Sequence, residues 1–352
     1  MWGGWVVECQ NEEMVHFSTS HPFTFIMSMP HDEPILIGPP GVGSHAVAFH
    51  EVVKYNDAQV KVFWNANELD LSNDKASFKT LPPIQQELVK KILGFFVVGD
   101  DIVGEHLSAS IRPHVSRFEL LNFLATQEYI ERVHMQAYDR LIREIVDSPQ
   151  EVEQLRRAIE NFPSIAALTH WVADFMPGGK APIHERIAAF VMFEGLIFSA
   201  AFAFIYWLRA QGKCPGLCGA NDWIARDEGI HTQTWAYAYR CLQNKASKER
   251  CADMIRSAVN ALDTFVSDVL PEPIGILSTE TMGVYVRSVA NSVSGLLGHG
   301  NIYDHAINPF QFMVNINLQN NTDLFVAPVT EYIGVGGMGS DPSFESVFGD
   351  DE

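Results

Sequence analysis

The stretch Glu131-Arg-Val-His-Met-Gln-Ala-Tyr138 lies within a long segment of helix-favouring residues. Spacings of three, four and seven residues place Glu131, His134 and Tyr138 one above the other on one face of a helix. A carboxylate and an imidazole three residues apart can both reach one metal ion from a single helical turn. On its own, however, such a pair usually belongs to a solvated helix face.

A second Glu-x-x-His pair occurs further along the sequence, at Glu228 and His231. In dinuclear carboxylate bundles, two helices each supply Glu-x-x-His and two others each supply one acid. Candidates for these acids are Glu194, inside the apolar stretch 187–208, and Asp100, in the helical segment before the first pair. Four carboxylates and two imidazoles suit two iron or manganese ions better than zinc.

The composition describes a globular protein that is large enough to bury a core. The 352 residues are 47% hydrophobic, and 43 acidic against 24 basic residues give a net charge of -19. This charge argues against binding to nucleic acid. The five cysteines form neither a disulfide-dense framework nor a Cys-x-x-Cys motif, and the N-terminus shows no secretory signal, which fits a reducing, cytoplasmic setting.

The apolar stretch 187–208 is long enough to pass for a membrane span. A lone carboxylate such as Glu194 at mid-bilayer would cost roughly 2.5 to 3.5 kcal/mol on insertion scales. A helix buried on all sides, with Glu194 as a metal ligand, explains both the hydrophobicity and the acid. We therefore expect no membrane association.

Hydrophobic periodicity and capping signals predict an all-α protein with one helical domain. Residues 1–45 are expected to form an irregular N-terminal arm, residues 46–307 the helical bundle, and residues 308–352 a flexible tail. Residues 65–74 and Cys214-Pro-Gly-Leu-Cys218 are expected to be loops. The predicted helices cover residues 46–64, 85–108, 117–146, a short segment opened by Ser148-Pro149, 165–175, 182–211, 222–243, 247–270 and 281–297.

The order of the motifs resembles the small, radical-generating subunit of class I ribonucleotide reductase, over about Trp64 to Tyr332. No single motif would suffice, but together they make a chance resemblance improbable. They are Phe63-Trp64 with Glu68-Leu-Asp-Leu-Ser72, Phe95-Phe-Val-Val-Gly-Asp-Asp-Ile-Val103, the stretch 131–138, Glu194-Gly-Leu-Ile-Phe198 and Ile224-Ala-Arg-Asp-Glu-Gly-Ile-His231. The resemblance implies a ferritin-like helical bundle with a dinuclear metal site in its core, and a homodimer.

The resemblance also implies the ligands of each metal ion. Asp100, Glu131 and His134 would hold one ion, and Glu194, Glu228 and His231 would hold the other. Neighbours on a helix point about 100 degrees apart, so only one of Asp100 and Asp101 can be a ligand, and the family pattern selects Asp100. The two ions would be iron, with manganese as the alternative.

In the family pattern Tyr138 carries a stable radical that a di-iron centre generates with dioxygen. A phenol has a pKa of about 10, so at neutral pH its proton must leave with the electron. Phe198, Phe202 and Ile224 would form an apolar pocket that excludes water from the radical. A tyrosine at position 138 favours the tyrosyl-radical type over relatives that carry phenylalanine there.

The resemblance further implies a route for the radical toward a large subunit, where nucleotides are reduced. Trp64 and Asp227, with His134, match its buried part, and Tyr332 matches a tyrosine in the tail. Phe344 and Phe348, four residues apart in an acidic setting, resemble a segment that docks into a partner's groove. The Gly-Asp-Asp-Glu that follows Phe348 departs from the usual pattern.

Two other classes of protein share part of this pattern. A di-iron oxygenase or desaturase has the same ligands but should lack the series formed by Trp64, Asp227 and Tyr332, and hydroxylation of a substrate would support it. An iron-storage bundle would take up iron without forming a radical. A purely structural bundle would be fully helical without depending on metal.

Overall fold

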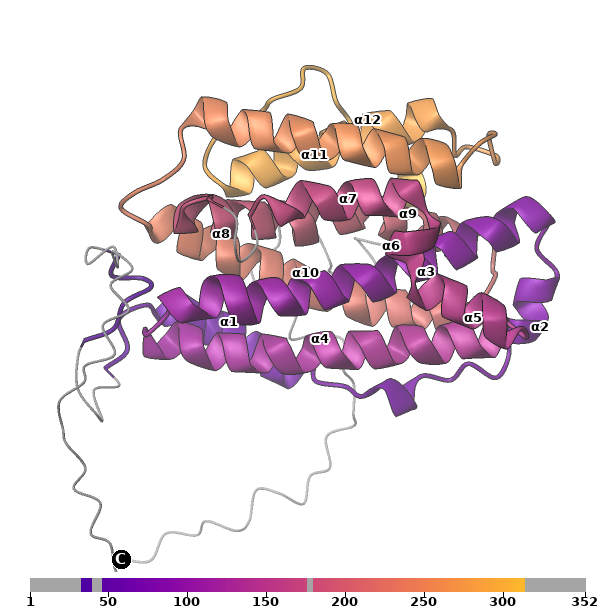
Figure 1. Cartoon of the computed structure of the whole chain (residues 1–352), viewed down its shortest axis with the longest axis horizontal. Coiled ribbons are helices and arrows are strands. Elements are labelled where there is room, and N and C mark those ends of the chain that lie inside the picture. Colours follow the sequence, from indigo (N-terminus) through magenta and orange to yellow (C-terminus); the bar gives the residue numbers. More distant parts are fainter. Residues whose placement is uncertain (1–32, 40–45, 176–179, 314–352) are drawn as a thin grey trace, which may run out of the picture. The chain divides into compact units, whose positions relative to one another are not determined.

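The computed structural model describes residues 33–39, 46–175 and 180–313, and the elements in these residues are helices with one isolated bridge between Ile274 and Leu277 (Figure 1). This confirms the predicted all-α fold. The α-helices are α1 (His50–Lys61), α2 (Asp74–Lys79), α3 (Pro83–Glu105), α4 (Phe118–Ile145), α5 (Pro149–Arg156), α6 (Ala158–Asn161), α7 (Pro163–Ala173), α8 (Ile183–Met192), α9 (Phe198–Ala210), α10 (Pro215–Cys241), α11 (Lys248–Val269) and α12 (Thr279–Leu296). Short 3-10 helices are η1 (Ala66–Glu68) and η3 (Arg112–His114), and π-helical turns are η2 (His106–Ile111) and η4 (Phe193–Ile197).

Several helix starts follow the capping chemistry that the sequence predicts. Ser148 accepts a hydrogen bond from the Glu151 N–H, and Pro149 occupies the first turn of α5. Ser247 caps α11 in the same way, by accepting the Arg250 N–H. These side chains satisfy N–H groups that have no partner within their own helices.

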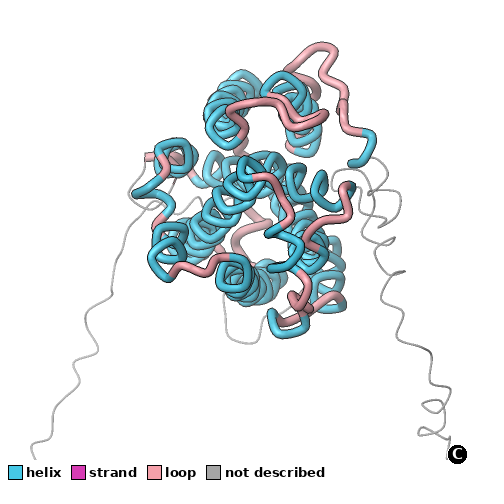
Figure 2. Tube along the Cα trace, turned by 90° about the vertical axis from the view of Figure 1, so that its right-hand side faces the viewer, coloured by secondary structure: helices cyan, strands magenta, loops and turns pink. Residues whose placement is uncertain are grey.

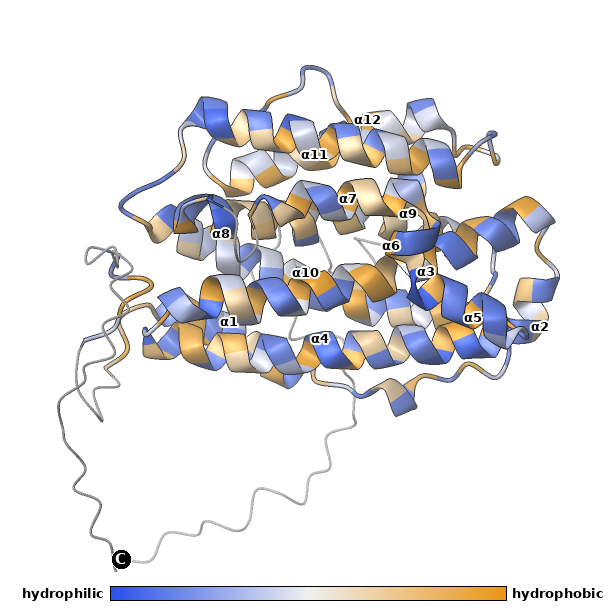
Figure 3. Cartoon of the chain, viewed as in Figure 1, coloured by the Kyte–Doolittle hydropathy of each residue, from blue (hydrophilic) through white to orange (hydrophobic). Residues whose placement is uncertain are grey.

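The long helices pack side by side and enclose one apolar core. Helix α3 packs on α4, α8 on α10, and α11 on both α7 and α12. Figure 2, turned by 90° from Figure 1, views most of these helices end-on. Figure 3 shows polar and apolar residues alternating along the exposed helices α4 and α11, as expected for helices with one buried face.

The expected helix over 182–211 contains a π-helical turn. Helix α8 leads into η4, which carries Glu194, and η4 leads into α9. The segment Ile183–Ala210 is apolar enough to cross a membrane, but its most apolar window is entirely buried in the bundle, as in the core helix of a soluble fold. A π-helical turn changes the direction of the side chains on either side of it and often marks a functional site.

The prediction of a loop at Cys214–Cys218 is wrong, because α10 begins at Pro215. The helix start is capped from a distant part of the sequence. The buried Asp74 carboxylate accepts hydrogen bonds from the N–H groups of Gly216 and Leu217, at 2.8 Å each. From the sequence alone, a proline and a glycine between two cysteines indicate a loop. The tertiary contact with Asp74 places them in the first turn of a helix.

Part of the predicted N-terminal arm lies against the bundle. The Glu33 carboxylate accepts the N–H groups of Gln243 and Asn244, at 2.6 and 2.8 Å. The Leu36 carbonyl accepts the N–H groups of Ser116 and Arg117. The boundaries predicted for the arm, the bundle and the tail remain predictions.

Gly99 provides a test of packing beside Asp100. An added Cβ would lie 2.5 Å from Cε1 of Phe198, whereas at Gly104, on the same helix, it would meet nothing within 4 Å. We expect Gly99→Ala to lower the free energy of unfolding by about 1–3 kcal/mol through overpacking. Gly104→Ala should raise it by about 0.5–1 kcal/mol through helix propensity. Thermal and urea unfolding of both variants measure this contrast, and equal effects would contradict it.

His106 should make the fold sensitive to acid. Its ring is buried against Phe190, Nε2 lies 3.2 Å from the Arg186 carbonyl, and burial lowers its pKa to about 4. Because the unfolded protein binds a proton near pH 6.5 and the folded one does not, stability should fall progressively as pH drops from 6.5 to 4. The loss contributed by His106 is about 3 kcal/mol. Urea unfolding of His106→Phe across this range should show a shallower decline than wild type, and parallel curves would refute the assignment.

Candidate metal centre

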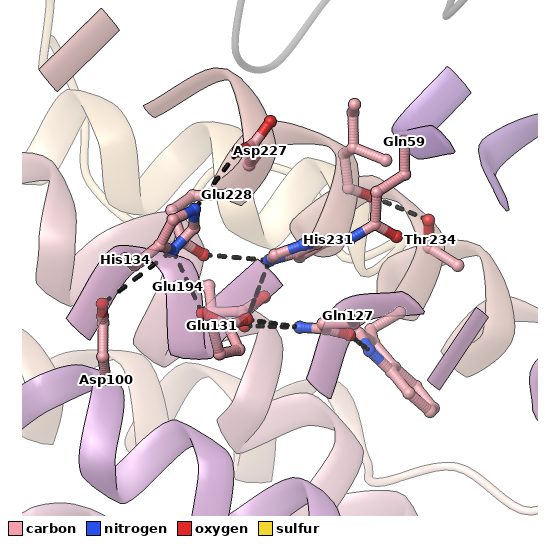
Figure 4. A network of polar contacts seen from close by, with 12 residues as sticks. Gln59, Asp100, Gln127, Glu131, His134, Glu194, Asp227, Glu228, His231 and Thr234 are labelled. Carbon is pink, nitrogen blue, oxygen red and sulfur yellow. Dashed lines mark hydrogen bonds and ion pairs between the residues drawn. The ribbon is translucent and has the colours of Figure 1, made fainter. Parts of the chain in front are cut away.

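Four helical elements place the six predicted ligands in one buried cluster (Figure 4). Helices α4 and α10 each contribute a Glu-x-x-His pair, α3 contributes one acid, and the π-helical turn η4 contributes another. All six residues are buried, and each is at most 2% exposed. They are Asp100, Glu131, His134, Glu194, Glu228 and His231.

The cluster consists of two overlapping groups that could each hold a metal ion. The first comprises Asp100, Glu131, His134 and Glu228, and the second comprises Glu131, Glu194, Glu228 and His231. Within each group the potential ligand atoms lie within 4.8 Å of one another. Glu131 and Glu228 belong to both groups, whereas the sequence analysis assigned each of them to one ion.

The two histidines present Nδ1 to the shared carboxylates. His134 Nδ1 lies 3.2 Å from both Glu131 Oε2 and Glu228 Oε1, and 3.9 Å from Asp100 Oδ2. His231 Nδ1 lies 3.1 Å from Glu131 Oε1 and 3.2 Å from Glu228 Oε2. Each shared carboxylate thus directs one oxygen toward each imidazole.

The unsatisfied polar atoms of the cluster fit a pair of cations. Both carboxylate oxygens of Asp100, Oε2 of Glu131 and of Glu194, Oε1 of Glu228 and Nδ1 of His134 are buried without a hydrogen-bond partner. Leaving such groups unpaired is costly, and a charged group costs most. Oxygen and imidazole donors of this number match two divalent ions of the iron or manganese type.

Burial and mutual charge set the protonation of the cluster without metal. Burial raises the pKa of Asp100 and Glu194 well above the usual carboxyl range. Burial alone would lower the pKa of His231, but the Glu131 and Glu228 carboxylates together outweigh it and raise that pKa to about 9. Ligands bind metal as carboxylates and neutral imidazoles, so metal binding displaces protons from these groups.

The outer nitrogen of each histidine has its own partner, which orients the ring. His134 Nε2 lies 3.2 Å from Asp227 Oδ2, and His231 Nε2 lies 2.7 Å from the amide nitrogen of Gln59. When Nδ1 binds a metal ion, Nε2 keeps the ring proton and donates it, so the Gln59 amide would then have to turn its oxygen, which has no hydrogen-bond partner here, toward the ring. One histidine is therefore held by an anion and the other by a neutral amide.

Tyr138 lies in an aromatic pocket one turn beyond His134. Its ring stacks on Phe96 at 4.8 Å, with 6° between the planes, and Phe96 in turn contacts Phe198 and Phe202. Ile224 is also buried. The sequence analysis quoted Phe96 only as part of a family motif and gave it no role beside Tyr138, because a phenylalanine in an apolar helix resembles ordinary core.

Trp64 is joined to His134 through Asp227. The Trp64 indole N–H donates to Asp227 Oδ2 at 2.7 Å, and the Trp64 ring stacks on the His134 ring with centroids 5.9 Å apart. Arg226 pairs with the other Asp227 oxygen, Oδ1, at 3.0 Å. Burial alone would raise the Asp227 pKa, but Arg226 and His134 hold it below its usual range. The sequence analysis missed Arg226 and also Trp223, whose ring meets Trp64 edge-on at 5.1 Å.

Three predicted residues lie outside the described part of the protein. They are Tyr332, Phe344 and Phe348.

A helical bundle that gathers two Glu-x-x-His pairs and two further acids into one buried cluster defines the ferritin-like class of dinuclear carboxylate proteins. The family model for the small chain of ribonucleotide reductase matches residues 45–309. The protein therefore belongs to the ribonucleotide reductase small-chain family.

Individual proteins agree with the family match. The sequence is 34% identical to the ribonucleoside-diphosphate reductase small chain of Nicotiana tabacum, over 77% of this protein and 82% of that one. It is 32% identical to the human ribonucleoside-diphosphate reductase subunit M2, over 88% and 79%. The ribonucleotide reductase R2 subunit from Clostridium botulinum shares the fold, with a TM-score of 0.69, 20% identity, and coverage of 77% and 88%.

Proposed function

We propose that this protein holds two iron or manganese ions in its buried cluster and stores an oxidising equivalent on Tyr138 for use by a separate large subunit. The observation that carries the proposal is the pair of overlapping ligand groups, with Tyr138 one helical turn beyond His134. Asp100, Glu131, His134, Glu194, Glu228 and His231 are the proposed ligands. When bound, the metal pair supplies the oxidising power, drawn from dioxygen, for removing one electron from a phenol.

The environment of Tyr138 suits a phenol that loses its proton and its electron together. Burial, and then the charges of Asp100 and Glu228, raise the Tyr138 pKa well above its ordinary value of 10.0. The phenol therefore stays protonated at any physiological pH, and oxidation requires a proton acceptor in the cluster. Tyr138 is only 2% exposed, and the stacked Phe96 ring supports the role proposed for Phe198, Phe202 and Ile224 in excluding water.

The contacts of Trp64 support a role in moving the oxidising equivalent outward. An ionised Asp227 accepts the Trp64 indole proton in a hydrogen bond and orients His134 from its other side. Trp64 can therefore pass an electron inward while its N–H stays bonded to a fixed carboxylate. We propose that Tyr332 continues this route, and that the tail with Phe344 and Phe348 docks on the large subunit of a cytoplasmic enzyme whose small subunit is a homodimer.

Activity measured with the partner tests this function. The metal-free protein is reconstituted with ferrous iron and dioxygen, or with manganese, and combined with a class I large subunit. We expect a tyrosyl signal in electron paramagnetic resonance from the reconstituted protein. Deoxyribonucleoside diphosphates should form only when both subunits are present. Oxidised metal that hydroxylates a substrate without a radical would support an oxygenase instead, and iron uptake alone would support storage.

A further inference from the structure

Gln127 makes hydrogen bonds to ligands of both metal groups. Its side-chain Nε2 donates to Glu131 Oε1 at 3.1 Å and to Glu194 Oε1 at 2.9 Å (Figure 4). Gln127 is fully buried and lies one turn before Glu131 on α4, whereas Glu194 comes from the π-helical turn η4. One amide group therefore uses both of its N–H bonds to join two carboxylates from different elements.

Trp235 fixes the orientation of that amide. The Trp235 indole N–H donates to Gln127 Oε1 at 2.8 Å. An indole nitrogen can only donate, so the amide must turn its oxygen toward Trp235 and its nitrogen toward the carboxylates. The indole is itself held by edge-on contacts with Phe123 and Phe190, and Trp235 is fully buried.

We infer that Gln127 and Trp235 together position the carboxylates of Glu131 and Glu194 for the metal ion nearest His231. The two oxygens that Gln127 holds are the ones closest to that histidine, since His231 Nδ1 lies 3.1 Å from Glu131 Oε1 and 3.7 Å from Glu194 Oε1. His134 Nδ1 faces the opposite oxygen of Glu131, Oε2, at 3.2 Å. Gln127 therefore acts mainly on one of the two groups.

Two physical effects give this pair its role. Two N–H donors from one amide hold the two oxygens at fixed positions and favour the ionised form of each carboxyl, which is the form that binds a cation. Glu194 also stands on a π-helical turn, an irregular element that often occurs at functional sites. The hydrogen bond from Gln127 links that side chain to helix α4 and keeps it within reach of the ion nearest His231.

This inference rests on the proposed function, because it assumes that the cluster binds two ions. The test titrates the metal-free full-length protein with Co²⁺ and follows visible absorption, which needs neither a radical nor a large subunit. Gln127→Met keeps the length of the side chain but removes both donors. We expect wild type to bind two ions, and Gln127→Met to bind one normally and the other about tenfold or more weakly.

A second variant separates positioning from simple packing. Trp235→Phe leaves Gln127 in place but frees its amide to turn, so the same ion should be weakened by a smaller factor. The matched control is Gln233→Met. Gln233 is a buried glutamine on α10, and among the described residues it makes no hydrogen bond to the cluster, so this variant should bind metal as wild type does. Circular dichroism of each metal-free variant confirms that it is folded.

Double variants assign the effect to one group. Combined with His231→Ala, Gln127→Met should cause little further loss, because the ion that it serves is already gone. Combined with His134→Ala, its effect should persist. Two-ion binding by wild type with unchanged binding by Gln127→Met and Trp235→Phe would overturn the inference alone. Failure of wild type to bind two ions would overturn the proposed function, and this inference with it.

Discussion

Replacing Tyr138 with phenylalanine is expected to abolish the tyrosyl radical and reduce nucleotide reduction with the large subunit to background. The substitution removes only the hydroxyl, and the ring can keep its stacking on Phe96. Metal content and unfolding temperature should therefore stay close to wild type. Electron paramagnetic resonance of the iron-reconstituted variant, alongside metal analysis, measures both expectations.

Tyr285 provides the discriminating comparison. It is also buried, and it lines a small cavity together with the candidate ligands Glu194 and Glu228. If Tyr138 carries the radical, Tyr285→Phe should retain the signal with the same hyperfine pattern. A signal that survives in Tyr138→Phe and disappears in Tyr285→Phe would move the radical to the other phenol.

Glu131→Gln is expected to weaken the binding of both metal ions, because Glu131 belongs to both ligand groups. A neutral amide offers one weak oxygen donor where the carboxylate offers two charged ones. We expect each ion to bind at least about tenfold more weakly. Each bound ion should also stabilise the wild-type fold, by about 2.7 kcal/mol at a free concentration of one hundred times Kd, and a tenfold weaker Kd should reduce this gain to about 1.4 kcal/mol or less in the variant at the same concentration.

Glu128→Gln is the matched control for that loss. It makes the same chemical change on the same helix, three residues earlier, outside both ligand groups. Metal content by mass spectrometry and the shift in unfolding temperature on adding ferrous iron without dioxygen should be normal in this variant. Two tightly bound ions in Glu131→Gln would mean that the shared position does not bridge the two groups.

The parts of the site that could be predicted from the sequence are those with a helical spacing. Glu131 with His134 and Glu228 with His231 stand one turn apart, so their convergence on one ion needs no knowledge of the packing. Glu194 was found because an acid in an apolar helix needs a partner, whereas Asp100 was selected over Asp101 by the family pattern. The structure confirms that all of these side chains meet, although their ligation of metal stays a prediction.

The parts that could not be predicted depend on contacts between elements. Gln59 and Gln127 contact the cluster, and Trp235 contacts Gln127, from positions that the sequence does not distinguish from those of other buried residues. The π-helical turn at Glu194 interrupts a run that is apolar on every side, so periodicity could not reveal it. Helix α10 was predicted to start too late because its cap, Asp74, comes from α2.

That cap also has a consequence for the order of events during folding. Helix α10 carries one histidine and one glutamate of the metal cluster, and its first turn is held by a carboxylate that lies 142 residues earlier in the sequence. Contacts between residues so far apart in sequence form late, since closing a long loop carries an entropic cost. We therefore expect the cluster to be complete only late in folding, so that a metal pair bound there would report a finished fold rather than nucleate one.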